Sequence, residues 1–135
     1  LALTGDRIYE EYLREQLAWA EEAMKEPSFR RAPVKICVIH APMVDFGDPD
    51  DFVPHQWMNR HFMPLLKQGG IDLMIGADLH EHLFIPAGTM NNAFPILIND
   101  NESRLDVQVW KDRIEATVYD EAGKAMVPTY TIKIK

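Results

Sequence analysis

Several residue types are scarce in this 135-residue sequence, and each shortage narrows the classes of protein it can represent. The single cysteine, Cys37, excludes an intrachain disulfide and reads as a small buried hydrophobe. No run of about 18 apolar residues is present, so we expect no membrane span. No secretory leader is visible. Because the chain starts at Leu1 rather than methionine, we expect residues upstream and leave the compartment undetermined.

Positive charge is also in short supply. Fourteen lysines and arginines stand against 21 acidic residues, which gives a net charge of −7. This balance argues against bulk binding to nucleic acid or to an anionic membrane, both of which rely on basic surfaces. The net negative charge does not exclude binding of a small phosphate ester. With 47% hydrophobic residues, the chain predicts one globular domain or part-domain over residues 1–135.

Two short apolar runs end in side chains that bind metals. Residues 34–39 lead into His40, and residues 71–75 lead towards Asp78 and His80. Apolar runs of this length are typical of parallel strands that are buried on both faces. Functional residues gather at the carboxyl ends of such strands. We therefore expect imidazole and carboxylate groups around one point, which is the chemistry of a Zn, Fe or Mn site.

The cluster after the second run allows two registers. In extended backbone, residues two apart point the same way. Asp78 can therefore act with His80, or His80 with His82. The first register predicts that Asp78 and His80 face His40 while His82 turns away. A mononuclear Zn²⁺ site of His40, His80 and His82 is a further alternative.

Helical and irregular segments flank these runs. Residues 6–25 predict an amphipathic helix that Pro27 ends, and residues 28–32 predict a solvated basic turn. A second helix is expected from Pro54, with a break near residues 61–63 caused by Pro64, and a left-handed cap at Gly69. Residues 43–53 predict an acidic surface loop.

The remainder of the chain has the alternating pattern of β-structure. Apolar and polar residues alternate between short turns, which predicts an antiparallel meander with one buried face. We place its strands near residues 83–85, 94–98, 105–109, 114–118 and 130–134. Asn99, Asp100 and Asn101 are interpreted as turn formers. The fold class is α/β, with two helices on a short parallel strand pair followed by the meander.

Four pieces in this order resemble the calcineurin-like metallophosphoesterases, in the style of the purple acid phosphatases. They are Gln16-Leu17-Ala18-Trp19, His40-Ala41-Pro42, Pro64-Leu65-Leu66-Lys67, and Ile71-Asp72-Leu73-Met74-Ile75 with its histidine-bearing loop. Their spacing is similar to the C-terminal half of that family's catalytic domain. The resemblance implies half of a four-layer α/β/β/α sandwich. It also implies hydrolysis of phosphate mono- or diesters at a two-metal centre.

The resemblance also implies roles for particular residues. His40, Asp78 and His80 would bind the metals, either two divalent ions or an Fe(III)/divalent pair of Fe, Mn or Zn. His55 corresponds loosely to a histidine that contacts the substrate phosphate, and would donate a hydrogen bond or a proton to the leaving oxygen. In the family's Gly-His-x-His motif, Asp78 stands where the first histidine is expected.

A second departure concerns the family's other ligands. These come from Asp-x-His, Gly-Asp and Gly-Asn-His motifs in an N-terminal half. Here Gly5-Asp6-Arg7-Ile8-Tyr9 has the letters of the second motif without a preceding strand. We therefore expect the site to need the N-terminal half of the same protein, or a homo-oligomer. The alternative is a non-catalytic or degenerate module that binds a partner.

Overall fold

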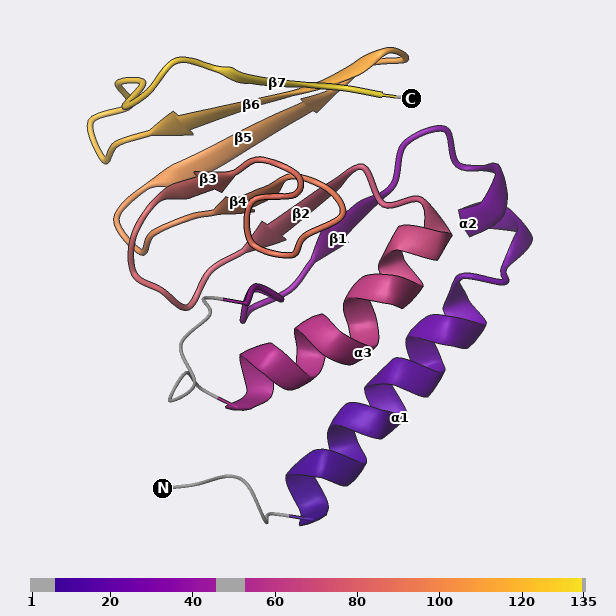
Figure 1. Cartoon of the computed structure of the whole chain (residues 1–135). Helices are drawn as coiled ribbons and strands as arrows, with labels where there is room; N and C mark the ends of the chain where they lie inside the picture. The colour runs from indigo at the N-terminus through magenta and orange to yellow at the C-terminus, as the bar shows by residue number, and fades with distance from the viewer. Residues whose placement is uncertain (1–6, 46–52, 135) are drawn as a thin grey trace.

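The structure is a computed structural model that describes residues 7–45 and 53–134. It is a mixed α/β fold with three helices and two sheets in this part of the chain. The helices are α1 (Arg7–Ala23), α2 (Pro27–Arg31) and α3 (Val53–Gly69). The two long helices, α1 and α3, lie on one side of the first sheet, and the second sheet covers its other side (Figure 1). None of these helices is long and apolar enough to cross a membrane.

The first sheet has the strand order β1-β2-β4-β3. Its strands are β1 (Ile36–Val38), β2 (Leu73–Gly76), β3 (Leu83–Ile85) and β4 (Ile96–Ile98). β2 pairs in parallel with both β1 and β4, whereas β3 runs antiparallel to β4 at the edge. The predicted parallel pair of β1 and β2 is confirmed, and β4 extends it to three strands.

The prediction that residues 83–85 and 94–98 belong to the meander is wrong. These residues form β3 and β4 of the first sheet instead. All three residues of β4 are buried. A strand that is apolar on both faces suits the interior of a parallel sheet covered on both sides, and does not suit a one-sided meander.

The second sheet is the antiparallel meander that the alternating pattern predicts. Its strands, in spatial order, are β5 (Arg104–Val109), β6 (Arg113–Tyr119) and β7 (Tyr130–Lys133). In the central strand β6, every second residue is fully buried. This alternation places one face of the sheet against the first sheet and leaves the other face to solvent.

The first sheet separates two apolar clusters because neighbouring residues of a strand point to opposite faces. Met74 of β2 and Ile96 of β4 face the helices. Leu73 and Leu97 face the second sheet, where they meet Ile114 and its neighbours. Each strand of the parallel trio therefore contributes to both layers of the core. The residues at the carboxyl edge of the first sheet therefore follow strands that are packed on both faces.

Two helical predictions need correction near the N-terminus. Residues 28–32, expected to be a solvated turn, lie in and directly after the short helix α2. Pro27 occupies the first turn of that helix, where its missing amide proton is not needed. The longer helix α1 ends at Ala23, slightly before the predicted limit, and buries Leu13 and Ala20 against the core.

The helix α3 passes through Pro64 without the break that we predicted. Pro64 is exposed, while Phe62, Met63 and Leu66 are buried around it. The apolar contacts of these neighbours hold the helical course in spite of the one missing amide donor. The left-handed residue after the helix is Gly70, at φ 74°, rather than the predicted Gly69. A left-handed glycine at this place lets the chain turn directly into β2.

Candidate functional site

Backbone hydrogen bonds join the carboxyl ends of the parallel strands into one edge. The amide of Ala77, just after β2, donates to the carbonyl of His40, just after β1, at 2.8 Å. The amide of Asn99, after β4, donates to the carbonyl of Gly76 at 3.0 Å. These bonds fix the position of the residue after Ala77 relative to His40. Asp78 is thereby held beside the end of the neighbouring strand.

Asp78 lies between two histidines. Its Oδ1 is 3.2 Å from His40 Nε2, and its Oδ2 is 3.6 Å from His55 Nε2. The predicted register, in which Asp78 faces His40, agrees with these distances. Asp78 also has a left-handed backbone, at φ 72°. For a residue other than glycine this conformation is strained, and such strain collects at functional sites.

The two histidines differ in their access to solvent. The His40 side chain is 78% exposed, whereas that of His55, in the first turn of α3, is only 5% exposed. The Asp78 carboxylate thus lies between the buried ring of His55 and the solvent-exposed ring of His40. Ligands or substrates in solution can reach this pair from the His40 side.

The two later histidines point to different surroundings. His80 is exposed and left-handed, at φ 55°, and no hydrogen bond or ion pair joins it to His40 or Asp78 in the described part of the chain. The approach of His80 to His40 stays a prediction. His82 Nε2 lies 2.9 Å from the hydroxyl of Tyr130 in β7. His82 is turned away from Asp78, as the first register predicts, and it joins the two sheets.

The donor types and spacing of His40 and Asp78 fit part of a metal site. Imidazole nitrogen and carboxylate oxygen are donors for Zn, Fe and Mn. Two atoms that share a tetrahedral metal at about 2.1 Å lie about 3.4 Å apart, close to the 3.2 Å between His40 and Asp78. Among residues 7–45 and 53–134, no group of three or more His, Cys, Asp or Glu could hold an ion. The metal roles of His40, Asp78 and His80 remain predictions.

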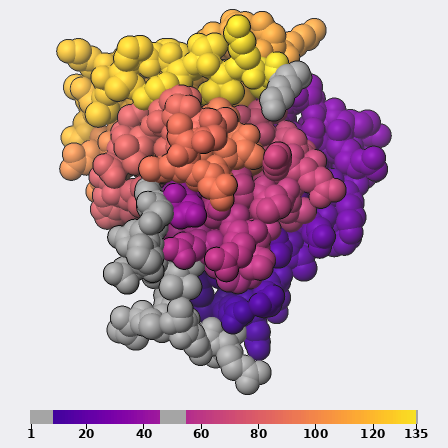
Figure 2. Space-filling view, in the orientation of Figure 1, coloured from indigo at the N-terminus to yellow at the C-terminus, as the bar shows by residue number. Residues whose placement is uncertain are grey.

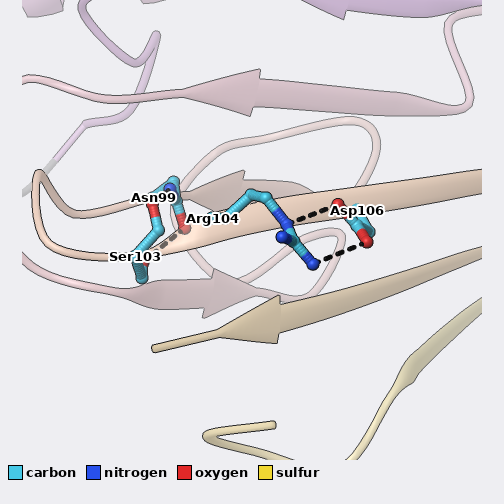
Figure 3. A network of polar contacts seen from close by, with 4 residues as sticks. All are labelled: Asn99, Ser103, Arg104 and Asp106. Atoms are coloured by element: carbon cyan, nitrogen blue, oxygen red, sulfur yellow. Dashed lines mark hydrogen bonds and ion pairs between the residues drawn. The ribbon is translucent and has the colours of Figure 1, made fainter. Parts of the chain in front are cut away.

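The polar residues after β4 form a turn, as their composition predicts. Asn99 Nδ2 donates to the carbonyl of Ser103 at 2.9 Å, and the Ser103 hydroxyl donates to Asn99 Oδ1 at 3.0 Å (Figure 3). The Ser103 side chain beside Asp100 is the main reason that the pKa of the Asp100 carboxyl lies below its ordinary value. Beyond this turn, Arg104 and Asp106 pair along the exposed side of β5. These polar groups are occupied in local structure.

Sequence reasoning missed the contribution of Tyr130. Its ring stacks on Phe84 with centroids 4.4 Å apart, while its hydroxyl meets His82. Tyr130 comes from the last strand and is far from the cluster in sequence, so spacing alone offered no signal. Residues 46–52, which include most of the predicted acidic loop, lie outside the described residues.

Comparison with known proteins yields a fold likeness and no family. No protein-family model matches the sequence, and no curated protein matches it. A solved structure described as GAP50, the anchor in the inner membrane complex of Plasmodium, matches with a TM-score of 0.73 and 13% sequence identity. The match covers 99% of this chain and 47% of that chain, so this chain spans about half of its length. At this identity, the likeness shows a shared fold alone.

Proposed function

We propose that this chain is part of a metal-dependent phosphoesterase that hydrolyses phosphate mono- or diesters at a two-metal centre. The observation that carries the proposal is the convergence of His40 and His55 on Asp78 at the carboxyl edge of a parallel sheet. This edge is where α/β proteins place their ligands. The motif order that resembles the metallophosphoesterases gives the reaction class. The centre would use Fe, Mn or Zn, and small phosphate esters would be its substrates.

Each residue of the cluster has a distinct part in this chemistry. His40 and Asp78 would bind one metal, and the exposed His80 would bind the second once the site is complete. Bound metals lower the pKa of a water to about 7 and balance the charge of an in-line displacement. His55 is buried against Asp78, which favours a role in orienting that carboxylate. Donation from His55 to the leaving oxygen requires its ring to become reachable in the completed site.

We further propose that additional polypeptide completes both the ligand set and the sandwich. Helices, first sheet and second sheet supply three layers, and a four-layer α/β/β/α sandwich needs one more. The open edge of β1 supports this proposal. Two backbone hydrogen bonds join β1 to β2 at its ends. The amide of Asp72 donates to the carbonyl of Lys35 at 2.8 Å, and the amide of Ile39 donates to the carbonyl of Ile75 at 3.0 Å.

The backbone amide and carbonyl groups of the alternate residues of β1 therefore point away from β2. In a parallel ladder, this direction leaves the backbone groups of Ile36 and Val38 for another strand. Val38 is also 76% exposed, which is unusual for a valine within a sheet. A strand from the N-terminal half of the same protein, or from another copy of the chain, would cover this edge.

The test compares this chain with a longer protein that contains it. We expect the longer protein, loaded with Mn²⁺, Zn²⁺ or Fe²⁺, to hydrolyse nitrophenyl phosphate or its diester with saturation. We expect no useful turnover from residues 1–135 alone, because most ligands are missing. Asp78→Asn and His40→Asn should each lower the activity of the longer protein by about 10- to 100-fold or more.

His61→Asn serves as the matched control, since its ring packs on Trp57 rather than on Asp78. Full activity in the Asp78 and His40 variants would contradict the proposed site. Robust saturable turnover by the 135-residue chain would contradict the need for a completing segment.

A second candidate function is a non-catalytic module that binds a protein partner. The structural neighbour is described as an anchor, and the described residues supply no complete ligand group. Under this reading, the open β1 edge is the functional surface and the Asp78 cluster is a remnant. A longer protein that binds no metal and hydrolyses neither ester, yet captures a partner through β1, would favour this candidate.

A further inference from the structure

The other end of the first sheet holds a cavity that the phosphoesterase proposal does not use. It has a volume of about 570 Å³, within the range of small-molecule sites. Its walls come from the amino ends of β2 and β4, the end of α3, and strand β7 of the second sheet. Asp72 and Lys35 lie at this amino end, whereas His40 and Asp78 lie at the carboxyl end. The cavity is therefore separate from the candidate metal cluster.

The cavity is positively charged in a molecule that carries −7 overall. Three lysines line it, Lys35, Lys67 and Lys133, against a single carboxylate, Asp72. Asp72 is already engaged, because its Oδ2 accepts a hydrogen bond from the Lys35 amide at 2.9 Å. Lys67 and Lys133 are exposed and form no ion pair within the described residues. The local excess of positive charge is therefore available to an anion.

Lys35 is the most firmly positioned of the three ammonium groups. Its Nζ donates to the carbonyl of Ala32 at 3.0 Å and lies 5.4 Å from the centre of the Phe29 ring. Phe29 lines the neighbouring cavity and not this one, so the Lys35 ammonium lies on that side and the rest of Lys35 belongs to the wall described here. Lys35 is half-buried, and its side chain is held in place before any ligand arrives.

Most of the remaining lining is apolar. Phe84 is stacked on Tyr130 with an interplanar angle of 16°, and Ile132 is 7% exposed. Prolines 86 and 95 belong to the same wall. In the space-filling view, the C-terminal strands (yellow) meet the segment before β4 (orange) along one surface (Figure 2). Apolar walls with a few convergent charges are typical of sites for ligands with a polar head and an apolar body.

We propose that this cavity binds a small amphipathic monoanion, an aryl or medium-chain carboxylate, with its head between Lys67 and Lys133. The apolar body would lie on Phe84 and Ile132. A charge-assisted hydrogen bond from lysine to carboxylate supplies orientation, and the apolar contacts supply most of the affinity. The inference goes beyond the proposed hydrolysis and does not depend on it.

The experiment is a titration with octanoate, followed by calorimetry and by amide chemical shifts of isotope-labelled protein. Octanol and octylamine, which have the same chain with a neutral and a cationic head, are the matched probes. We expect octanoate to bind with shifts at Lys35, Lys67 and Ile132, and with none at His40 or Asp78. Octanol and octylamine should bind at least about tenfold more weakly.

The variants separate the cavity from general charge effects. Lys67→Glu with Lys133→Glu should weaken octanoate binding at least about tenfold. The control, Lys111→Glu with Lys124→Glu, makes the same change in net charge at exposed turns and should leave the affinity unaltered. All four lysines are exposed, so the folded spectrum is expected to persist. Equal binding of the three probes, equal losses in both double variants, or shifts centred on Val38 would overturn the proposal.

Discussion

At the scale of single residues, burial rather than charge determines how Cys37 behaves. Its thiol lies within β1, and burial raises its pKa above the ordinary value. A raised pKa means less thiolate at neutral pH, and the thiolate is the reactive form. We expect iodoacetamide to label Cys37 more slowly in the folded protein than in urea, with the rate rising only at more alkaline pH. Mass spectrometry over time measures both rates, and equal rates in the two states would contradict this expectation.

Asn92 shows how a buried amide can hold a loop. It is 3% exposed, and its Nδ2 donates to the carbonyls of Pro86 and Phe94 at 3.0 and 2.9 Å. Its Oδ1 accepts from the amide of Met90 at 2.9 Å. We expect Asn92→Ala to lower the free energy of unfolding by about 1–3 kcal/mol, because buried backbone groups lose their partners. Urea denaturation measures the change.

The control for this prediction is Asn101→Ala, at an exposed turn position. It should change the free energy of unfolding by no more than about 0.5 kcal/mol. An equal loss in both variants would mean that the Asn92 bonds contribute nothing particular to the loop.

At the scale of elements, the turn after β4 links pH to stability. The pKa of Asp100 is lowered mainly by the neighbouring Ser103 side chain, and also by the amide of Glu102, which donates to Oδ1 at 2.9 Å. Because the folded pKa lies below the unfolded one, the stabilisation is complete above the unfolded pKa. It is lost as the pH falls through the lowered folded value. We expect Asp100→Asn to flatten this part of the unfolding profile.

The measurement is the free energy of unfolding from neutral to acidic pH, in both proteins. The two profiles should converge at the acid end, where Asp100 is protonated in the parent protein. A constant difference between them at every pH would exclude titration of Asp100 as the cause.

Helix α3 continues through Pro64, where a break was expected, and this suggests a test of the proline's effect on stability. Pro64 sits inside the helix, is exposed, and supplies no amide proton to the preceding turn. We expect Pro64→Ala to stabilise the protein by about 2 kcal/mol, since it restores an amide donor in the helix, although it also frees the unfolded chain. Thermal and urea unfolding report the change. A less stable variant would show that the proline geometry itself supports the packing of α3.

The elements also show how far sequence reasoning reached. Periodicity of two identified β5 and β6, and the short apolar runs identified β1 and β2, because these patterns follow directly from which faces are buried. Sequence reasoning also located β4 but assigned it to the wrong sheet, because its three buried residues have no alternation and its partner β2 is separated from it by β3. Pairing between strands that are distant in sequence is set by packing of the whole core, which no local pattern records.

In the candidate site, too, some features could be predicted from the sequence and others could not. Asp78 and His40 were predictable because strand ends and residue spacing place them together. The burial of His55 behind Asp78 depends on where α3 starts relative to the sheet, and the sequence does not state that. The contact of His82 with Tyr130 depends on how the second sheet packs on the first.

At the scale of the whole molecule, the open edge of β1 predicts association. Among the described residues β1 has one partner strand in the first sheet, and Val38 at its end is 76% exposed. Exposed apolar strand edges recruit other chains. We expect the 135-residue chain to form dimers, or to bind a complementary fragment of the same protein, so that light scattering gives a mass above the 15.5 kDa of one chain.

Val38→Lys tests whether β1 is the surface responsible. A charged lysine at a sheet edge opposes the addition of another strand, so we expect this variant to shift the population towards the monomer. Gln108→Lys places a new lysine on β5, an edge strand of the second sheet, and should leave the mass unchanged if association uses β1. A monodisperse monomer of the parent chain that unfolds cooperatively on heating would contradict the prediction. It would mean that the sheet edge at Val38 is stable in water without a partner strand.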